Sequence, residues 1–453
     1  MANLSLKVSE TASNYLEQYD AAVEADKFPL VRKWIDTDPL TFFRELREKR
    51  PILVTPKCTL IALFDDVTEV LNMPLIFTTA LYLPKMGNGI YLMCHDDDAL
   101  HTREKSLMQG MLNRDDLPQV RNMVARIGKS LLDSSDGKIE AINGYCRMVP
   151  ATLVQEYFGL TGVDKKALIE WSYWNQADTF YNQPFDILPD EKRKEITDMH
   201  DKTGKKLSEY IVELVVRREL AVKAEQATNI IFAGWYALRM LLRSLMGRKN
   251  EKLTDDIVTR MVRTSYASAV EFDVKRLGIN AGGLLIGAIE TTSQAVAQVI
   301  EYLLNTPEWL AKAKAAAKQD NPAEFDGIVW EALRYVPICS YLFRQTASEY
   351  TVAKGTQHAT TIRPGTNVLL LTQSAMFDTK AFENPEQFVP GRNWYHYFHF
   401  GFGSHECLGK YVGMVMIPEM VRQILLRADI KEQGQIDYQG GHLPQQYNLT
   451  WGS

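Results

Sequence analysis

Apolar residues recur three or four positions apart along most of the chain, which is the spacing of one face of an α-helix. In residues 39–50, for example, Leu40 and Phe43 share a face. The same spacing predicts helices over residues 102–112, 118–133, 149–159 and 322–335. Strand-type alternation is confined to residues 52–64, which read as a small hairpin, and to residues 350–371, which contain glycine turns. The chain is therefore predicted to be mainly α with a small β region.

The longest helical pattern covers residues 273–305 and is nearly all apolar or small through its centre. A helix of this kind is buried on most sides, so we expect it to form the spine of the fold. Residues 74–93 carry two prolines, two glycines and many apolar side chains, and predict a long loop. Loops of this length usually carry function.

Aromatic residues are concentrated between residues 171 and 185. The members of this aromatic cluster are Trp171, Tyr173, Trp174, Phe180, Tyr181 and Phe185. Aromatic side chains at this density pack a core or line a ligand pocket. The sequence leaves both interpretations open.

Composition and charge indicate a globular protein and argue against nucleic-acid and membrane partners. Of 453 residues 46% are apolar, and no linker divides them, so we expect a single domain over residues 1–453 with an N-terminal arm over about residues 1–35. The 51 basic and 56 acidic residues are interleaved, which leaves no basic tract to bind nucleic acid. No signal-peptide pattern or membrane-spanning apolar run is present, so we expect a cytoplasmic protein without a membrane partner.

The five cysteines are scattered, which argues against a disulfide framework or a paired-cysteine zinc site. Cys407 lies in the glycine-rich run FGFGSHECLG, at residues 400–409, just before an apolar helix pattern. A helix N-terminus favours the thiolate, which is the form that binds metal. Gly403 and Gly409 would allow a tight turn and a close approach to a flat ligand, and Phe400 would pack beneath it. Taken alone, a single cysteine at a helix start is more often inert.

The run FGFGSHECLG resembles the FxxGxxxCxG signature of the cytochrome P-450 superfamily of haem-thiolate enzymes, in particular the soluble bacterial type. The resemblance extends from about residue 39 to the C-terminus. It implies a fold in which haem b, iron protoporphyrin IX, lies between the long central helix and the cysteine-ligand loop. Cys407 would be the axial iron ligand, whose thiolate favours O–O cleavage.

The central helical pattern contains GAIETT at residues 287–292, which resembles the family's oxygen-activating stretch. Gly287 and Thr291 share a helix face, so the Thr291 hydroxyl can bond to the Gly287 carbonyl and open the helix locally. A carboxylate is costly to bury in so apolar a helix, which makes Glu290 a candidate proton relay. The resemblance implies catalytic roles for Glu290 and Thr291 and places Gly287 beside the haem.

Two further sets of residues resemble the family in type and order. Glu331 and Arg334 match its ExxR motif, and Arg392 would complete a buried structural triad. The haem propionates need cationic or hydrogen-bonding partners. The residues that resemble the family's propionate ligands are His101, Lys105, Arg344 and His405. Lys105 stands where the family usually has arginine, which keeps the charge but loses the bidentate fork.

The resemblance implies a monooxygenase, an oxidoreductase that inserts one oxygen atom from dioxygen into an apolar small-molecule substrate. Electrons would come from an external ferredoxin and ferredoxin reductase or a similar donor. The expected pocket walls are the loop at 74–93, the aromatic cluster, and residues 283–288 and 338–342. Two alternatives remain, which are a peroxide-using or rearranging haem-thiolate enzyme and a non-catalytic haem sensor or ligand-binding protein. The Glu290 and Thr291 pair favours dioxygen activation over both.

Overall fold

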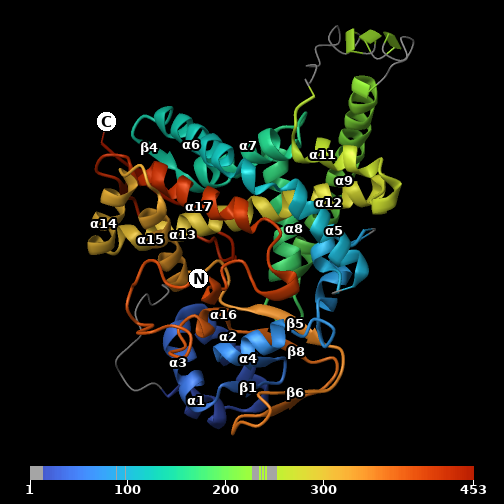
Figure 1. Ribbon diagram of the computed structural model, residues 1–453. Coiled ribbons are helices and arrows are strands. Elements are labelled where there is room, and N and C mark those ends of the chain that lie inside the picture. The colour runs from blue at the N-terminus through green and yellow to red at the C-terminus, as the bar shows by residue number, and fades with distance from the viewer. Residues whose placement is uncertain are drawn as a thin grey trace.

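Helices occupy most of the molecule, and short strands gather at the end that holds the first helices of the chain (Figure 1). The computed structural model describes residues 14–87, 89–96, 98–226, 234–235, 237–238, 240–241 and 253–452. Residues 1–13 of the predicted arm and residue 88 of the predicted loop lie outside the described residues. The prediction of a mainly α chain with a small β region is confirmed.

The helices predicted over residues 39–50, 102–112, 118–133 and 322–335 form close to those limits, and further helices form where none was predicted. The described helices include α3 (Pro39–Lys49), α4 (Phe64–Leu71), α5 (Ala99–Met111), α6 (Leu117–Asp133), α7 (Met148–Leu153), α8 (Lys165–Tyr181), α9 (Asp190–Gln226), α11 (Ile257–Ser265), α14 (Pro307–Ala317), α15 (Ala323–Tyr335), α16 (Thr372–Ala375) and α17 (Lys410–Leu425). The helix predicted over residues 149–159 starts as α7 and ends in a π-helical turn, Val154–Phe158. Among the residues that the structure describes, no helix is both long and apolar enough to cross a membrane.

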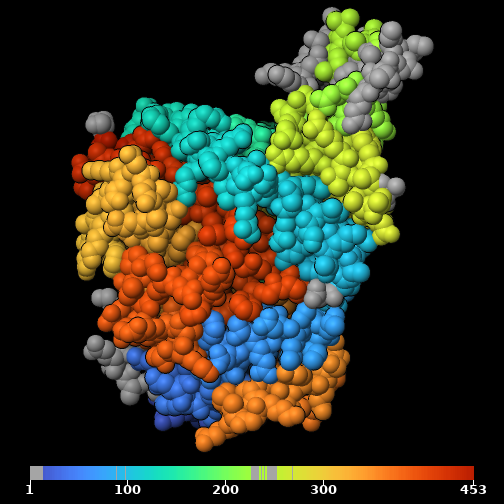
Figure 2. Space-filling view, viewed as in Figure 1, coloured from blue at the N-terminus to red at the C-terminus, as the bar shows by residue number. Residues whose placement is uncertain are grey.

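The largest sheet within the described residues has the strand order β1-β2-β8-β5-β3. Its strands are β1 (Ile52–Val54), β2 (Thr59–Ile61), β3 (Phe77–Thr78), β5 (Leu342–Thr346) and β8 (Asn367–Leu370). β1 and β2 form the hairpin predicted over residues 52–64. β2 pairs in parallel with β8, so the blue N-terminal surface adjoins the orange surface of the later strands in Figure 2.

The remaining strands in the described part of the chain form two small sheets. β6 (Tyr350–Val352) and β7 (Thr360–Ile362) make a hairpin, which together with β8 confirms the strand pattern predicted over residues 350–371. The other sheet has the order β4-β10-β9, with β4 (Lys138–Glu140), β9 (Lys431–Glu432) and β10 (Asn448–Thr450). It joins the C-terminal segment to the connection between α6 and α7.

The predicted N-terminal arm differs from the structure over residues 14–35. These residues form α1 (Tyr15–Ala21) and the first part of α2 (Glu24–Thr37). Val31 and Trp34 of α2 are buried in the same apolar cluster as Phe42 of α3. The segment therefore packs as part of the folded body, because its apolar side chains leave water against α3 and the sheet.

The central helical pattern at residues 273–305 forms two helices, α12 (Val274–Ala288) and α13 (Glu290–Leu304). The helix is interrupted at Ile289, whose φ and ψ are -89° and -63°. α13 buries 12 of its 15 residues, and α12 buries its central stretch from residue 280 to 285. The prediction of a buried spine is confirmed for α13 and for the centre of α12, and the interruption falls within the GAIETT sequence.

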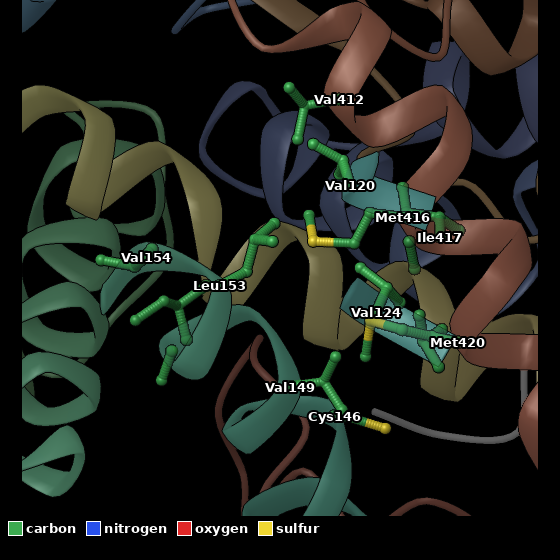
Figure 3. Packing of buried hydrophobic residues seen from close by; sticks show 14 of the residues in the cluster. Val120, Val124, Cys146, Val149, Leu153, Val154, Val412, Met416, Ile417 and Met420 are labelled. Atoms are coloured by element: carbon green, nitrogen blue, oxygen red, sulfur yellow. The ribbon is translucent and has the colours of Figure 1, made fainter. Parts of the chain in front are cut away.

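The helix that follows Cys407 is fixed by apolar packing against α6. Figure 3 shows Met416, Ile417 and Met420 of α17 close to Val120 and Val124 of α6. Full burial of such a side chain contributes about 1.5–3 kcal/mol relative to exposure. This packing holds the start of α17, and with it the cysteine loop, in one place.

Candidate functional site

A cavity of about 1290 Å³ is bounded by α8, α9, α12 and the loop that carries Cys407. Cys407, Gly287 and Thr291 all line it. The predicted pocket walls are confirmed, because the loop at 74–93, the aromatic cluster and residues 283–288 and 338–342 each contribute lining side chains. Segments that are distant in the sequence therefore enclose one space.

The aromatic cluster serves both of the purposes that the sequence left open. Phe180 and Tyr181, at the end of α8, line the cavity. Trp171 and Phe185 are packed in apolar core clusters. The cavity-lining pair lies at the end of α8, whereas Trp171 lies earlier in α8 and Phe185 lies beyond it.

The loop that carries Cys407 is set by a hydrogen bond and by two left-handed glycines. The Cys407 amide donates to the Phe400 carbonyl at 2.8 Å. Gly401 and Gly403 have φ values of 74° and 72°, which side chains other than glycine rarely adopt. The turn predicted at Gly403 is confirmed, whereas Gly409 has a φ of -84° and needs no such freedom.

The Cys407 thiol has exposed surface, and this surface faces the cavity. Burial raises the pKa of the thiol above its ordinary value, while a backbone hydrogen bond at Gly409 and the charge of Lys105 act in the opposite direction. Burial thus outweighs these two contributions, so the lowered pKa expected from the sequence is not found for the thiol. Coordination of a metal ion would remove the proton.

Thr291 and Gly287 form the groove that the sequence predicts. The Thr291 hydroxyl donates to the Gly287 carbonyl at 2.7 Å. A Cβ placed on Gly287 would meet no atom within 4 Å, so its face is open to the cavity. The groove lies at the interruption between α12 and α13, where carbonyl groups are available to side-chain donors.

Glu290 points away from this groove. Its side chain is 1% exposed, and its carboxylate accepts hydrogen bonds of 2.9–3.0 Å from Nε and Nη2 of Arg147. Burial raises the pKa of Glu290, and the charge and hydrogen bonds of Arg147 oppose that shift. Glu290 is not among the described residues that line the cavity, so the structure does not bring this carboxylate together with Thr291 there. Its catalytic role stays a prediction.

Sequence reasoning missed Arg147. A buried acid in an apolar helix signals a cationic partner, but any of the 51 basic residues could supply it. Arg147 also donates to the Asn143 side chain at 2.8 Å and to the Pro444 carbonyl at 3.0 Å. The ion pair therefore links α13 to the start of α7 and to the C-terminal segment.

Two of the four predicted propionate ligands line the cavity, Arg344 and His405. Arg344 is 7% exposed, and its hydrogen bond among the described residues is donated to the Phe343 carbonyl at 2.8 Å. Burial lowers the pKa of Arg344, and no ion pair to it is found in the described part of the chain. A buried guanidinium of this kind fits a carboxylate ligand within the cavity.

The other two predicted propionate ligands, His101 and Lys105, contact the cysteine loop. The His101 ring stacks on that of His405, with 4.6 Å between centroids. Lys105 Nζ donates to the Ser404 carbonyl and, at 2.7 Å, to the Glu406 carbonyl. Burial lowers the pKa of His405 to about 4, so its ring is neutral at pH 7 and donates from Nε2 to a backbone carbonyl at 2.7 Å.

The predicted structural triad is assembled in the core. Glu331 accepts hydrogen bonds from Arg334 at 2.7 Å, Arg392 at 3.2 Å and the Tyr397 hydroxyl at 2.6 Å. Burial opposes ionisation of Glu331, but Arg334, Tyr397 and the Val389 amide together lower its pKa. The triad ties α15 to the segment that leads into the cysteine loop.

The donor set fits a haem group. Cys407 offers one soft ligand, Gly287 leaves an open face, Phe400 lines the cavity, and Arg344 is a buried cation that forms no ion pair with any residue the structure describes. A flat cofactor with two carboxylates would use each of these features.

Comparisons with known proteins place this arrangement in a family. Residues 117–439 match the family model described as Cytochrome P450. The steroid C26-monooxygenase of Mycobacterium tuberculosis (strain CDC 1551 / Oshkosh) is 21% identical over 367 residues, which cover 80% of this chain and 85% of the relative. Cytochrome P450 monooxygenase PikC of Streptomyces venezuelae is 24% identical over 340 residues, covering 74% of this chain and 68% of the relative.

Solved structures show the same fold. The haem domain of CYP116B5 from Acinetobacter radioresistens aligns with a TM-score of 0.73 and 18% identity, covering 97% of this chain and 100% of that chain. The fold class expected from the cysteine signature is thereby confirmed.

Proposed function

The chain belongs to the cytochrome P450 family, and from this we propose that it inserts one oxygen atom from dioxygen into an apolar organic substrate with electrons from a separate donor. The observation that supports the proposal is one cavity that contains Cys407 and the groove between Gly287 and Thr291. The family match and the monooxygenase names of the relatives favour an enzyme over a non-catalytic haem sensor.

The cofactor of this monooxygenase is haem b, which when bound supplies the redox chemistry that activates dioxygen. We propose that Cys407 holds the iron and that Arg344 and His405 hold the propionates from the cavity wall. His101 would orient His405 through ring stacking. Lys105 would keep the cysteine loop rigid through its two carbonyl bonds.

We propose that the Thr291 hydroxyl donates protons into the cavity and that its hydrogen bond to the Gly287 carbonyl holds it in position. Glu290 would accept protons on the side of α13 that faces away from the cavity. There it is connected to solvent through Arg147 and the exposed Asn143. Delivery requires the Glu290 carboxylate to leave Arg147 and turn toward the groove. Because the ion pair is buried, this movement would separate two buried charges and would be energetically costly.

The substrate would be an apolar molecule held over the groove. The volume of about 1290 Å³ exceeds that of ordinary ligand pockets, about 300–1,000 Å³, and leaves room for both cofactor and substrate. One relative is named for a steroid, and a polycyclic apolar substrate is a reasonable first class to screen. Electrons would come from a ferredoxin and ferredoxin reductase or a similar donor, and we propose that residues 1–453 form one domain.

The first test is the absorption spectrum of the purified holoenzyme, reduced with dithionite and exposed to carbon monoxide. Thiolate ligation predicts a strongly red-shifted Soret band that is lost in Cys407→Ala. A histidine-type spectrum in the unaltered protein would contradict the proposal. Turnover with isotopically labelled dioxygen and a reconstituted ferredoxin system would then place one labelled atom in the product.

The placement of Glu290 favours one second candidate, a haem-thiolate enzyme that uses peroxide. An acid locked by Arg147 away from the cavity serves dioxygen activation poorly unless it moves. Product formed with hydrogen peroxide alone, at a rate equal to or above that with the electron donor, would support this candidate.

A further inference from the structure

The interruption between α12 and α13 is contacted by polar side chains of α8 that the mechanism above does not use. Gln176 Nε2 donates to the Ile286 carbonyl at 2.9 Å. The Ser172 hydroxyl approaches the same carbonyl at 3.4 Å. Gln176 is 3% exposed, lines the cavity, and joins two helices that do not follow each other in the chain.

This bond adjoins the proton-delivery groove. The Ile286 carbonyl precedes that of Gly287, which accepts from Thr291 at 2.7 Å. Two successive carbonyls at the end of α12 thus receive side-chain donors, one from α13 and one from α8. Buried carbonyls at a helix end need such partners. The shape of the interruption therefore depends on where α8 lies.

The same helix also covers the cavity. Phe180 and Tyr181, one turn beyond Gln176, line it and would contact a bound substrate. A shift of α8 on substrate binding would pull or release the Ile286 carbonyl through Gln176. Asn175, the adjacent amide, also lines the cavity but donates to the Trp171 carbonyl within α8 itself, at 2.8 Å. Of these two neighbouring amides, Gln176 is therefore the one whose bond crosses to α12, where its contact is shorter than that of the Ser172 hydroxyl.

We propose that Gln176 is a positioning residue that couples the placement of α8 over the substrate to the geometry of the Thr291 groove. It acts through the Ile286 carbonyl and transfers no proton itself. The inference rests on the proposed monooxygenase function, in which Thr291 delivers protons.

The test uses the holoenzyme reduced with dithionite, with carbon monoxide as the probe and the infrared C–O stretching band as the readout. Gln176→Met keeps the length of the side chain and removes the donor. We expect its band to shift or split, because the groove beside the bound gas loses its fixed shape. Asn175→Leu, the matched control, is expected to keep the band of the unaltered protein.

Hydrogen exchange gives a second readout that does not depend on the haem ligand. In Gln176→Met, amides of peptides covering residues 283–292 should exchange roughly fivefold faster, the equivalent of losing about 1 kcal/mol from one hydrogen bond. Asn175→Leu should leave these peptides unchanged.

An unchanged band and unchanged exchange in Gln176→Met would overturn the inference, as would equal effects in Asn175→Leu. If Gln176→Met does not fold, Gln176→Asn keeps the amide but shortens its reach, and it must show the same changes. Absence of the red-shifted Soret band in the unaltered protein would instead reject the proposed function, and exchange would still decide whether Gln176 holds α12.

Discussion

At the scale of single residues, the partner of each buried charge sets what that charge can do. Glu290 and Thr291 are neighbours in the sequence, yet Thr291 lines the cavity and Glu290 is bound by Arg147. Arg344 shows the opposite case, since it is buried against the cavity and no acid pairs with it in the described part of the chain. Glu290 is therefore placed to stabilise the fold, or to move only when its ion pair breaks. Arg344 is placed to bind a ligand in the cavity.

We expect Glu290→Gln to lower the free energy of unfolding by about 3–5 kcal/mol, because Arg147 would remain buried without its counter-charge. Chemical denaturation of the holoenzyme measures this. The double variant Glu290→Gln with Arg147→Met, which removes both charges, should recover most of the loss. A single variant as stable as the unaltered protein would mean that the ion pair contributes nothing.

Thr291→Ala should leave stability nearly unchanged while it uncouples electron use from product. The hydroxyl that bonds to the Gly287 carbonyl is lost, so proton delivery fails and peroxide forms instead. Product formed per electron pair should fall roughly tenfold or more. Thr291→Ser, which keeps the hydroxyl, is the control, and equal coupling in Ala and Ser variants would refute the assigned role.

At the scale of elements, the helices form the framework of the fold, and the candidate site lies where the central helix is interrupted. α12 and α13 would be one helix but for Ile289, and the groove lies at that point. The cysteine loop is held from three directions, by α17 packing, by Lys105 of α5 and by the triad on α15.

Glu331→Gln should destabilise the holoenzyme by about 3–5 kcal/mol and reduce its haem content. Arg334 is fully buried and would lose its acid, and the segment before the cysteine loop would lose the Arg392 contact. Thermal unfolding and the haem-to-protein absorbance ratio measure the two effects. Glu308→Gln, which breaks an exposed pair with Lys312, should change stability by less than about 0.5 kcal/mol.

At the scale of the whole molecule, the long apolar segments enclose a cavity with few charged groups, and burial keeps His399 and His405 in its wall neutral. Burial lowers the pKa of His399 to about 4, while its ring donates to the Trp330 carbonyl at 2.9 Å. The unfolded chain, with an ordinary histidine pKa near 6.5, binds that proton more readily. Acid therefore favours unfolding.

Stability should fall as the pH drops from about 6.5 to about 4, and His399 alone would account for about 3 kcal/mol over this window. Denaturation midpoints at a series of pH values test this. His399→Gln keeps a donor for the Trp330 carbonyl but does not titrate, so its curve should be shallower by up to about 1.4 kcal/mol per pH unit. Identical slopes for the two proteins would contradict the assignment.

The sequence by itself determined the fold class, several of the helices and the turn that holds Cys407. Apolar periodicity placed α3, α5, α6 and α15 because burial of one helix face leaves a local pattern. Gly403, before Cys407, predicted a tight turn, because left-handed backbone angles favour glycine. The packing of α1 and α2 was not predicted, since short helices show their apolar partner only when the chain is folded.

Only the tertiary structure decided which charged groups meet. Arg147 and Glu290 are 143 positions apart, and the sequence around either residue does not indicate that the two form a pair. The bond from Gln176 to the Ile286 carbonyl spans 110 positions and exists because α8 crosses α12 at that point. Local sequence encodes helix, turn and apolar face, whereas the pairing of buried polar groups depends on how those faces pack, which is a property of the whole chain.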